Sequence, residues 1–191
     1  MPLTPFSRRD LLAKGATLSL AGVGLLVGLN TKALAEDSSS TTSQDIDVLN
    51  EILGTEHEGI GAYQICLNRK LFHAGTAHTA RLFQDHHKKH RDFLIEKIAV
   101  LGGAPAASKT LDQYSDDLDI VNLKSQKEAL NLMVHLELGA ANAYIGMLPS
   151  TNDHELVKVA SRIAADEVIH WTTMSSLLGL PLPSEALSFG A

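Results

Sequence analysis

Four segments of this chain carry apolar residues at the i, i+3, i+4, i+7 spacing of an amphipathic α-helix, and this pattern constrains the fold more than any other feature. The segments span residues 45–71, 76–101, 123–148 and 153–178. Gly102 and Gly103 end the second segment, and Pro149 separates the third from the fourth. The chain is 45% hydrophobic but only 5% aromatic, which favours packed helices over a β-sandwich. We therefore predict an all-α fold.

The lengths of the connections predict how the helices are joined. Only a few residues separate the first segment from the second and the third from the fourth, so each pair is expected to form an antiparallel hairpin. The connection from Ala104 to Val121 is long enough to run the length of a bundle. We predict a four-helix bundle at residues 45–178, made of two hairpins joined by one long crossover, followed by an irregular tail at residues 179–191.

Polar side chains interrupt each apolar stripe at positions where core residues are expected. They are Glu56, His87, His90, Glu137, Glu167 and His170. In the second helix the periodicity selects His87 and His90 and leaves His86 off the apolar face. Because an isolated charge is costly to remove from water, carboxylates and imidazoles at one level of the bundle indicate a bound cation. Interhelical salt bridges and hydrogen-bonded core histidines are the alternative.

The two halves of the chain repeat the spacing of these residues. Glu56 and His90 are 34 positions apart, and Glu137 and His170 are 33 positions apart. Both glutamates are followed at the same offset by Ala-Tyr, which predicts a pseudo-twofold centre between the hairpins. The single cysteine excludes a Cys-rich site, and Glu with neutral His suits iron, manganese or zinc rather than calcium.

The order of these residues resembles the ferritin-like superfamily of di-iron carboxylate proteins, and the resemblance covers about residues 45–178. Its most specific part is the run Asp166-Glu167-Val168-Ile169-His170. The resemblance implies that Glu167 is a bridging ligand and that Asp166 accepts a hydrogen bond that orients a histidine. The terminal metal ligands that it implies are Glu56, His90, Glu137 and His170.

In the second helix the chain departs from the family pattern, which has Asp-Glu where this chain has His86 and His87. One of two bridging carboxylates is thus replaced by an imidazole. An unsymmetrical metal pair and a single metal both remain open.

Two tyrosines and several short side chains lie near the predicted ligands. Tyr63 and Tyr144 are expected close to the site, about two turns from Glu56 and Glu137. We favour core packing for them, with a hydrogen bond to a ligand carboxylate or a redox role as alternatives. The short side chains that leave room for a small oxidant are Ala62, Ala140, Ala141 and Ala143.

The first 35 residues resemble a twin-arginine signal peptide. Arg8 and Arg9 precede an apolar stretch at residues 15–29, and residues 33–35 offer a small-x-small cleavage site. The apolar stretch is shorter than the ~20 residues that a membrane span needs, which disfavours an uncleaved anchor. We predict export by this route, to the periplasm or otherwise out of the cytoplasm, with residues 36–44 as a flexible linker to the bundle.

The charge of the remaining chain excludes some classes of partner. Removing the leader takes the formal net charge from −6 to −9, and no basic stripe is left that could follow a nucleic-acid backbone. No later apolar segment is long enough to cross a membrane. We therefore expect neither nucleic acid nor a membrane span.

These observations and the resemblance together predict an exported metal-binding protein. The favoured function is an oxidoreductase of ferroxidase or peroxidase type, in which non-haem iron, as one ion or a di-iron pair, reacts with dioxygen or peroxide. Manganese and zinc are alternative metals, and the alternative function is a non-catalytic metal-binding or stress-related bundle. The expected partners are metal ions and a small oxidant, and a homodimer through bundle faces is compatible with the pattern.

Overall fold

The computed structural model describes residues 38–151 and 153–189. The α-helices in this part are α3 (Ser38–Asn68), α4 (Ala74–Val100), α5 (Leu111–Asp117), α6 (Gln126–Met147) and α7 (His154–Leu177), and the 3₁₀ turns are η2 (Ile120–Asn122) and η3 (Leu148–Ser150). The described residues contain no strand, so the prediction of an all-α fold is confirmed.

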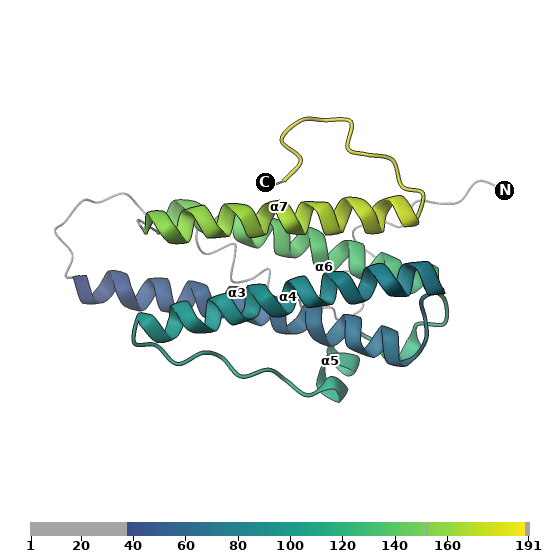
Figure 1. Cartoon of the computed structure of the whole chain (residues 1–191), viewed down its shortest axis with the longest axis horizontal. Coiled ribbons are helices and arrows are strands. Elements are labelled where there is room, and N and C mark those ends of the chain that lie inside the picture. The colour runs from purple at the N-terminus through teal and green to yellow at the C-terminus, as the bar shows by residue number, and fades with distance from the viewer. Residues whose placement is uncertain (1–37, 152, 190–191) are drawn as a thin grey trace.

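The four long helices form two hairpins, α3 with α4 and α6 with α7 (Figure 1). The bundle closes because α6 packs against α3 and α4 faces α7. Residues 101–125 run along the outside of the bundle and join the two hairpins. They include the long crossover predicted at residues 104–121. They contain α5, which packs on α3. The prediction left this helix out because its seven residues are too few to show a helical period.

Two helix starts differ from the prediction. α3 begins at Ser38 rather than at Asp45, so residues 38–44, expected as part of a linker, continue the helix. Ser and Thr each disfavour a helix by less than about 1 kcal/mol relative to Ala, and an established helix can extend through them because propagation is easier than nucleation. α6 begins at Gln126, later than expected, because Ser125 caps it. The Ser125 hydroxyl accepts a hydrogen bond from the Glu128 N–H, and the Glu128 carboxylate accepts one from the Ser125 N–H.

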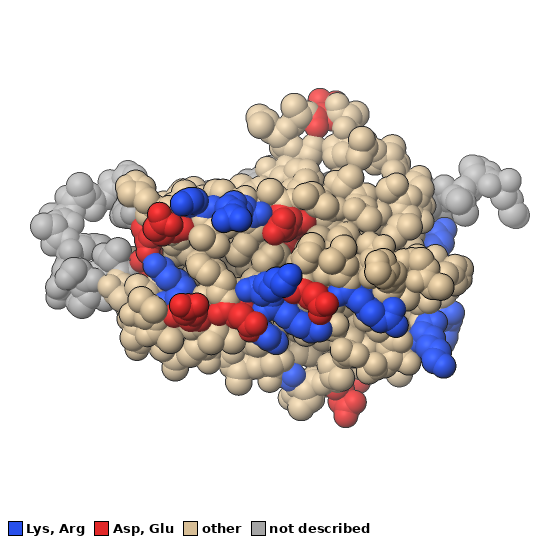
Figure 2. Space-filling model, viewed as in Figure 1, with Lys and Arg blue, Asp and Glu red and all other residues tan. Residues whose placement is uncertain are grey.

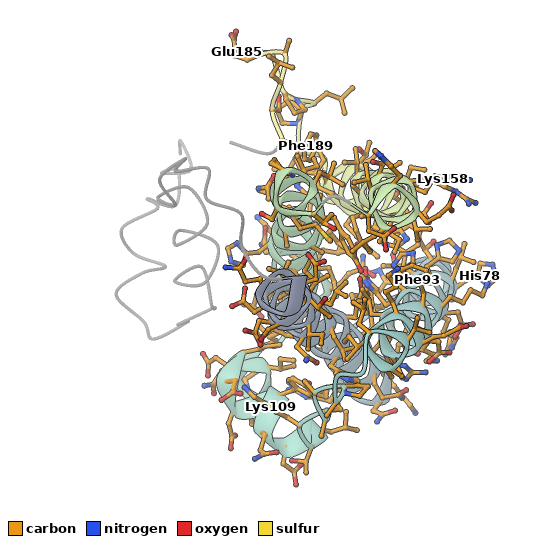
Figure 3. The ribbon with its side chains drawn as sticks, turned by 90° about the vertical axis from the view of Figure 1, so that its left-hand side faces the viewer. His78, Phe93, Lys109, Lys158, Glu185 and Phe189 are labelled. Atoms are coloured by element: carbon orange, nitrogen blue, oxygen red, sulfur yellow. The ribbon has the colours of Figure 1, made fainter. Side chains whose placement is uncertain are left out.

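The remaining predictions concern the two ends of the chain. The predicted signal peptide, residues 1–35, lies outside the described residues. Residues 179–189 form neither helix nor strand, and Phe189 returns to α7, where its ring meets that of Trp171 edge-on at 5.2 Å between centroids (Figure 3). Within the described part of the chain, no helix has both the length and the apolar character needed to span a bilayer.

The surface seen in Figure 2 carries both signs of charge. Lys and Arg side chains are intermixed with Asp and Glu side chains along α4 and α7 on this face. This face therefore has no continuous basic stripe.

The core consists of two apolar clusters that lie on either side of the polar residues. The first cluster includes Tyr63, Phe83, Met133 and Met174, and the second includes Leu53, Leu94, Tyr144 and Ile163. In each long helix the predicted ligands lie between residues of one cluster and residues of the other. The packed clusters thus fix the level at which the polar side chains point inward and cover that level on either side.

Candidate metal centre

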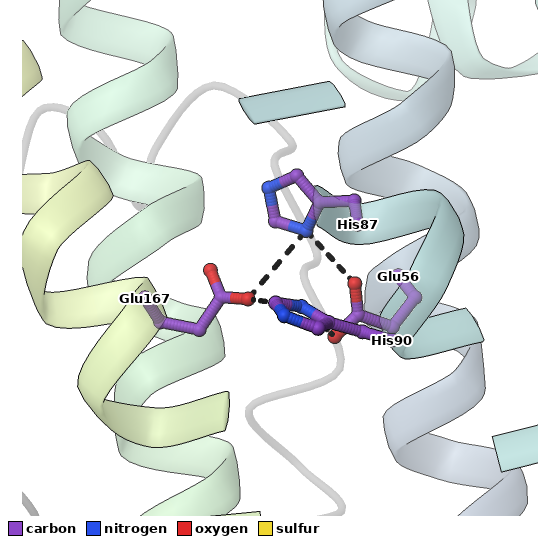
Figure 4. Close-up of side chains that lie close together, drawn as sticks. All are labelled: Glu56, His87, His90 and Glu167. Carbon is purple, nitrogen blue, oxygen red and sulfur yellow. Dashed lines mark hydrogen bonds and ion pairs between the residues drawn. The ribbon is translucent and has the colours of Figure 1, made fainter. Parts of the chain in front are cut away.

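The six side chains that the sequence analysis predicted as ligands converge in the middle of the bundle. None is more than 6% exposed. Their donor atoms form two overlapping groups. We call Glu56, His87, His90 and Glu167 the first set, shown in Figure 4, and His87, Glu137, Glu167 and His170 the second set. Every long helix contributes to the centre, and α4 and α7 each contribute two residues three positions apart, which lie on the same side of a helix.

The atoms of the first set are close enough to share one ion. His87 Nδ1 lies 2.8 Å from Glu56 Oε2 and 3.6 Å from Glu167 Oε1. His90 Nδ1 lies 2.9 Å from Glu167 Oε1 and 3.7 Å from Glu56 Oε1. Ligands at about 2.0–2.1 Å in a tetrahedral site lie roughly 3.3 Å from one another. The spacing of these atoms therefore fits a transition-metal ion.

The second set has similar dimensions. His170 Nδ1 lies 3.3 Å from Glu137 Oε2 and 3.3 Å from Glu167 Oε2. His87 Nε2 lies 3.4 Å from Glu137 Oε1. The second set thus offers another group of nitrogen and oxygen donors, and it shares His87 and Glu167 with the first.

The charges of the centre are strongly coupled. Burial alone would raise the pKa of Glu56, but the hydrogen bond with His87 and the charges of His87 and His90 bring it down to about 2. Burial disfavours protonation of His90, yet Glu167 and Glu56 raise its pKa to about 10. The nearby carboxylates likewise outweigh burial and raise the pKa of His87 well above its usual value. Without metal, protons on the imidazoles therefore balance the carboxylates.

Protons do not satisfy every buried atom of the centre. Both carboxylate oxygens of Glu167 and Nδ1 of His90 are buried and have no hydrogen-bond partner within the described residues. Glu167 Oε1 and His90 Nδ1 are 2.9 Å apart but are not aligned as a hydrogen bond. Burial is the first cause of a raised pKa at Glu167. Unsatisfied buried polar atoms are rare, and a cation between these donors would satisfy them. The residues present therefore fit a metal.

Asp166 lies where the sequence analysis expected an orienting acceptor. Its Oδ2 is 3.3 Å from His90 Nε2, on the far side of the ring from Glu167. A proton on Nε2 of His90 can be donated to Asp166, and Nδ1 is then free to bind metal.

The sequence analysis missed His86 as part of the site, because it lies off the apolar stripe. His86 Nδ1 is 3.0 Å from His170 Nε2, so His86 stands to His170 as Asp166 stands to His90. The repeat could have revealed it. Aligning His86-His87-Lys88-Lys89-His90 with Asp166-Glu167-Val168-Ile169-His170 places His86 opposite Asp166. Each orienting residue serves the histidine of the other hairpin.

Tyr63 and Tyr144 do more than fill the core. Both are buried, and each donates a hydrogen bond to a glutamate of the other hairpin. Tyr63 donates to Glu137 Oε1, and Tyr144 donates to Glu56 Oε1 at 2.5 Å. Burial and the adjacent carboxylates raise the pKa of both phenols well above the usual value, so the phenols remain protonated donors. Core packing, the favoured prediction, describes only part of their role.

A cavity of about 380 Å³ reaches the centre from the side of α3 and α6, beneath the crossover. Tyr63, His87 and Glu137 form its inner end. Its walls include Ala140 and Ala143, which were predicted to leave room, whereas Ala62 and Ala141 are fully buried and do not line it. The glycines Gly54, Gly59 and Gly139 also line it, and the helical pattern gave no sign of their role.

Comparisons with known proteins agree with the fold. Residues 44–180 match the family model described as a ferritin-like domain. The crystal structure of a conserved hypothetical protein from Mycobacterium tuberculosis is similar at a TM-score of 0.61 and 20% sequence identity, over 79% of this chain and 99% of that chain. At this identity the likeness shows the fold alone. No curated protein matches the chain.

Proposed function

This chain belongs to the ferritin-like domain family, and we propose that its two overlapping ligand sets hold a non-haem iron centre that reacts with dioxygen or peroxide. The environment of Glu167 carries the proposal. This carboxylate is fully buried, has no hydrogen-bond partner within the described residues, and faces His87, His90 and His170. A buried carboxylate whose oxygens receive no hydrogen bond is costly, and a cation bound between it and these imidazoles would offset that cost.

The donor set is compatible with iron, and the resemblance to di-iron carboxylate proteins favours it. Carboxylates and imidazoles bind iron, manganese and zinc. The negative charge of the three glutamates favours a divalent cation. Iron, when bound, would supply the electrons for reduction of an oxidant. Manganese or zinc in the same site is the alternative.

The residues around the centre support a reaction with a small oxidant. Tyr63 and Tyr144 hold two of the carboxylates in place, and Asp166 and His86 orient two of the histidines. The apolar clusters keep bulk water away from most of the centre. The cavity beside His87 and Glu137 leaves one route by which a small molecule can approach.

A non-catalytic metal-binding protein is the second candidate. The observation that favours it is His87, an imidazole at the position where the resemblance implies a second bridging carboxylate. A centre with fewer carboxylates stabilises a higher oxidation state of iron less well. In that case the bundle would sequester or transport the ion without oxidising it.

Oxidation of ferrous iron separates the two candidates. The full chain is loaded with Fe²⁺ without oxygen and then mixed with dioxygen or hydrogen peroxide, and the ferric absorbance is followed. We expect oxidation faster than that of free Fe²⁺, and no acceleration in a Glu167→Ala, His170→Ala double variant. Bound Fe²⁺ that oxidises no faster than free Fe²⁺ would leave the binding protein as the better assignment.

We also propose that the protein is exported to the periplasm. The support is the leader pattern around Arg8 and Arg9, followed by an apolar stretch and a small-x-small site. Replacing both arginines by lysine keeps the charge and removes the twin-arginine pattern. Cell fractionation of the full chain should then find the variant retained inside the cell, and continued export of the variant would contradict this route.

A further inference from the structure

Two residues belong to both ligand sets, and they occupy corresponding positions in the two hairpins. Glu167 on α7 and His87 on α4 align in the internal repeat, three positions before His170 and His90. Each of the other ligands belongs to a single set. The internal repeat thus relates the two shared residues to each other.

Glu167 divides its two oxygens between the sets. Oε1 faces His90 at 2.9 Å in the first set, and Oε2 faces His170 at 3.3 Å in the second. This is the arrangement of a carboxylate that bridges two ions.

His87 divides its two ring nitrogens in the same way. Nδ1 faces Glu56 at 2.8 Å in the first set, and Nε2 faces Glu137 at 3.4 Å in the second. The ring also lies close to α3. A Cβ on Gly59 would be in ordinary van der Waals contact with it, at 3.4–3.5 Å from three ring atoms of His87.

We propose that His87 bridges two metal ions, with Nδ1 bound to the ion of the first set and Nε2 bound to the ion of the second. This inference rests on the metal centre proposed above. It assigns the residue that departs from the family pattern a bridging role equivalent to that of Glu167.

The charge of the centre agrees with an imidazolate bridge. Binding through both nitrogens requires each ring nitrogen to give up any proton it carries to solvent, which leaves one negative charge on the ring. Three ionised glutamates and one imidazolate then balance two divalent ions, with His90 and His170 neutral. A buried centre without net charge avoids the desolvation cost of an unpaired ion.

A titration of the metal-free full chain with Co²⁺ tests the bridge. Visible absorbance follows the binding steps, elemental analysis gives the equivalents bound, and low-temperature EPR reports magnetic coupling between the ions. The variants are His87→Gln, His87→Glu and, as a control that touches only the first set, His90→Gln. Circular dichroism checks that each variant is folded.

The wild type should bind two Co²⁺ ions that are magnetically coupled. His87→Gln should weaken both steps, each by more than the roughly 100-fold that marks the upper end of the cost of losing an outer partner of a ligand. His90→Gln should weaken one step, and His87→Glu should keep two ions with an altered coupling. A His87→Gln variant in which one step is unchanged would overturn the bridge, as would a wild type that saturates at one equivalent.

Two further outcomes distinguish the bridge from the centre itself. If His87→Gln does not fold, an unchanged coupling in His87→Glu overturns the bridge, because the bridging atoms have been replaced. If the wild type binds no Co²⁺, the metal centre itself is wrong, and the bridge falls with it.

Discussion

Tyr144 on α6 donates a hydrogen bond of 2.5 Å to Glu56 on α3. The corresponding bond runs the other way, from Tyr63 on α3 to Glu137 on α6. The two bonds cross between the hairpins, so each of these glutamates is fixed by a phenol from the hairpin to which it does not belong. The ligands are therefore positioned by the assembled bundle and not by either hairpin alone.

Replacing Tyr144 by Phe should destabilise the metal-free protein. The phenol donates to a buried carboxylate, and its loss leaves that oxygen without this donor, at a cost of about 1–3 kcal/mol. Urea unfolding of Tyr144→Phe against wild type measures the difference. The free energy of unfolding should fall in Tyr144→Phe. It should fall by a similar amount in Tyr63→Phe. Equal stability of both variants and wild type would show that these bonds carry no net energy.

Removing the imidazole of His86 should weaken metal binding. His86 lies 3.0 Å from His170 Nε2 and orients a predicted ligand, a role whose loss typically costs about 10–100-fold in affinity. Competition with a chelator gives the affinity of His86→Ala. His86→Asp should retain most of it, because Asp166 fills the equivalent place in the other half. His78→Ala, on the exposed side of the same helix, is the control and should bind as wild type does. Loss of affinity in the control, or none in His86→Ala, contradicts the role.

The metal-free protein should lose stability as the pH rises above neutrality. The folded-state pKa of His90 is raised to about 10, so its contribution is fully present below the ordinary value of 6.5 and disappears as the pH approaches 10. At the acid end, the pKa of Glu56 is lowered to about 2, and its contribution is lost as the pH falls from 4.5 toward 2. The thermal unfolding temperature of chelator-treated protein, measured across this pH range, reports both the alkaline and the acid loss of stability.

A His90→Gln variant provides the control for the loss of stability at alkaline pH. It should show a flatter decline between pH 6.5 and 10, because the titrating imidazole has been removed. If wild type and variant decline in parallel, another group causes the loss.

Filling the cavity should slow oxidation without removing metal. Apart from its chain neighbours and the nearby backbone of α6, a Cβ on Gly139 meets no described atom within 4 Å, so Gly139→Leu can place its side chain in the cavity. We expect oxidation of bound Fe²⁺ to slow about tenfold, which corresponds to ~1.4 kcal/mol in the barrier. Stopped-flow absorbance measures the rate, and elemental analysis the metal content. Gly75→Leu, at an equally open position away from the cavity, should leave both unchanged. An unaltered rate in Gly139→Leu would mean that the oxidant enters elsewhere.

The sequence predicted those features that depend on helical period. The apolar stripes located the four long helices, and the interruptions identified side chains that converge in space. The start of α6 depends on a cap, and α5 is too short for a period, so neither could be placed by the stripes. The stripes did not identify His86, because it contacts the centre from a position beside the apolar stripe of α4. The cavity could not be predicted from the helical period, because glycines on two helices and residues of the crossover form it.

The metal content of the full chain is the most direct test of the account. The purified protein, reconstituted with iron or manganese, is compared by elemental analysis with a Glu167→Ala, His170→Ala double variant, and circular dichroism confirms that both are folded. The account predicts about one or two equivalents of metal in wild type, as in dinuclear bundle sites, and none in the variant. A wild type that is folded and metal-free after reconstitution would contradict the central claim, and the buried glutamates and histidines would then be an ion-paired core.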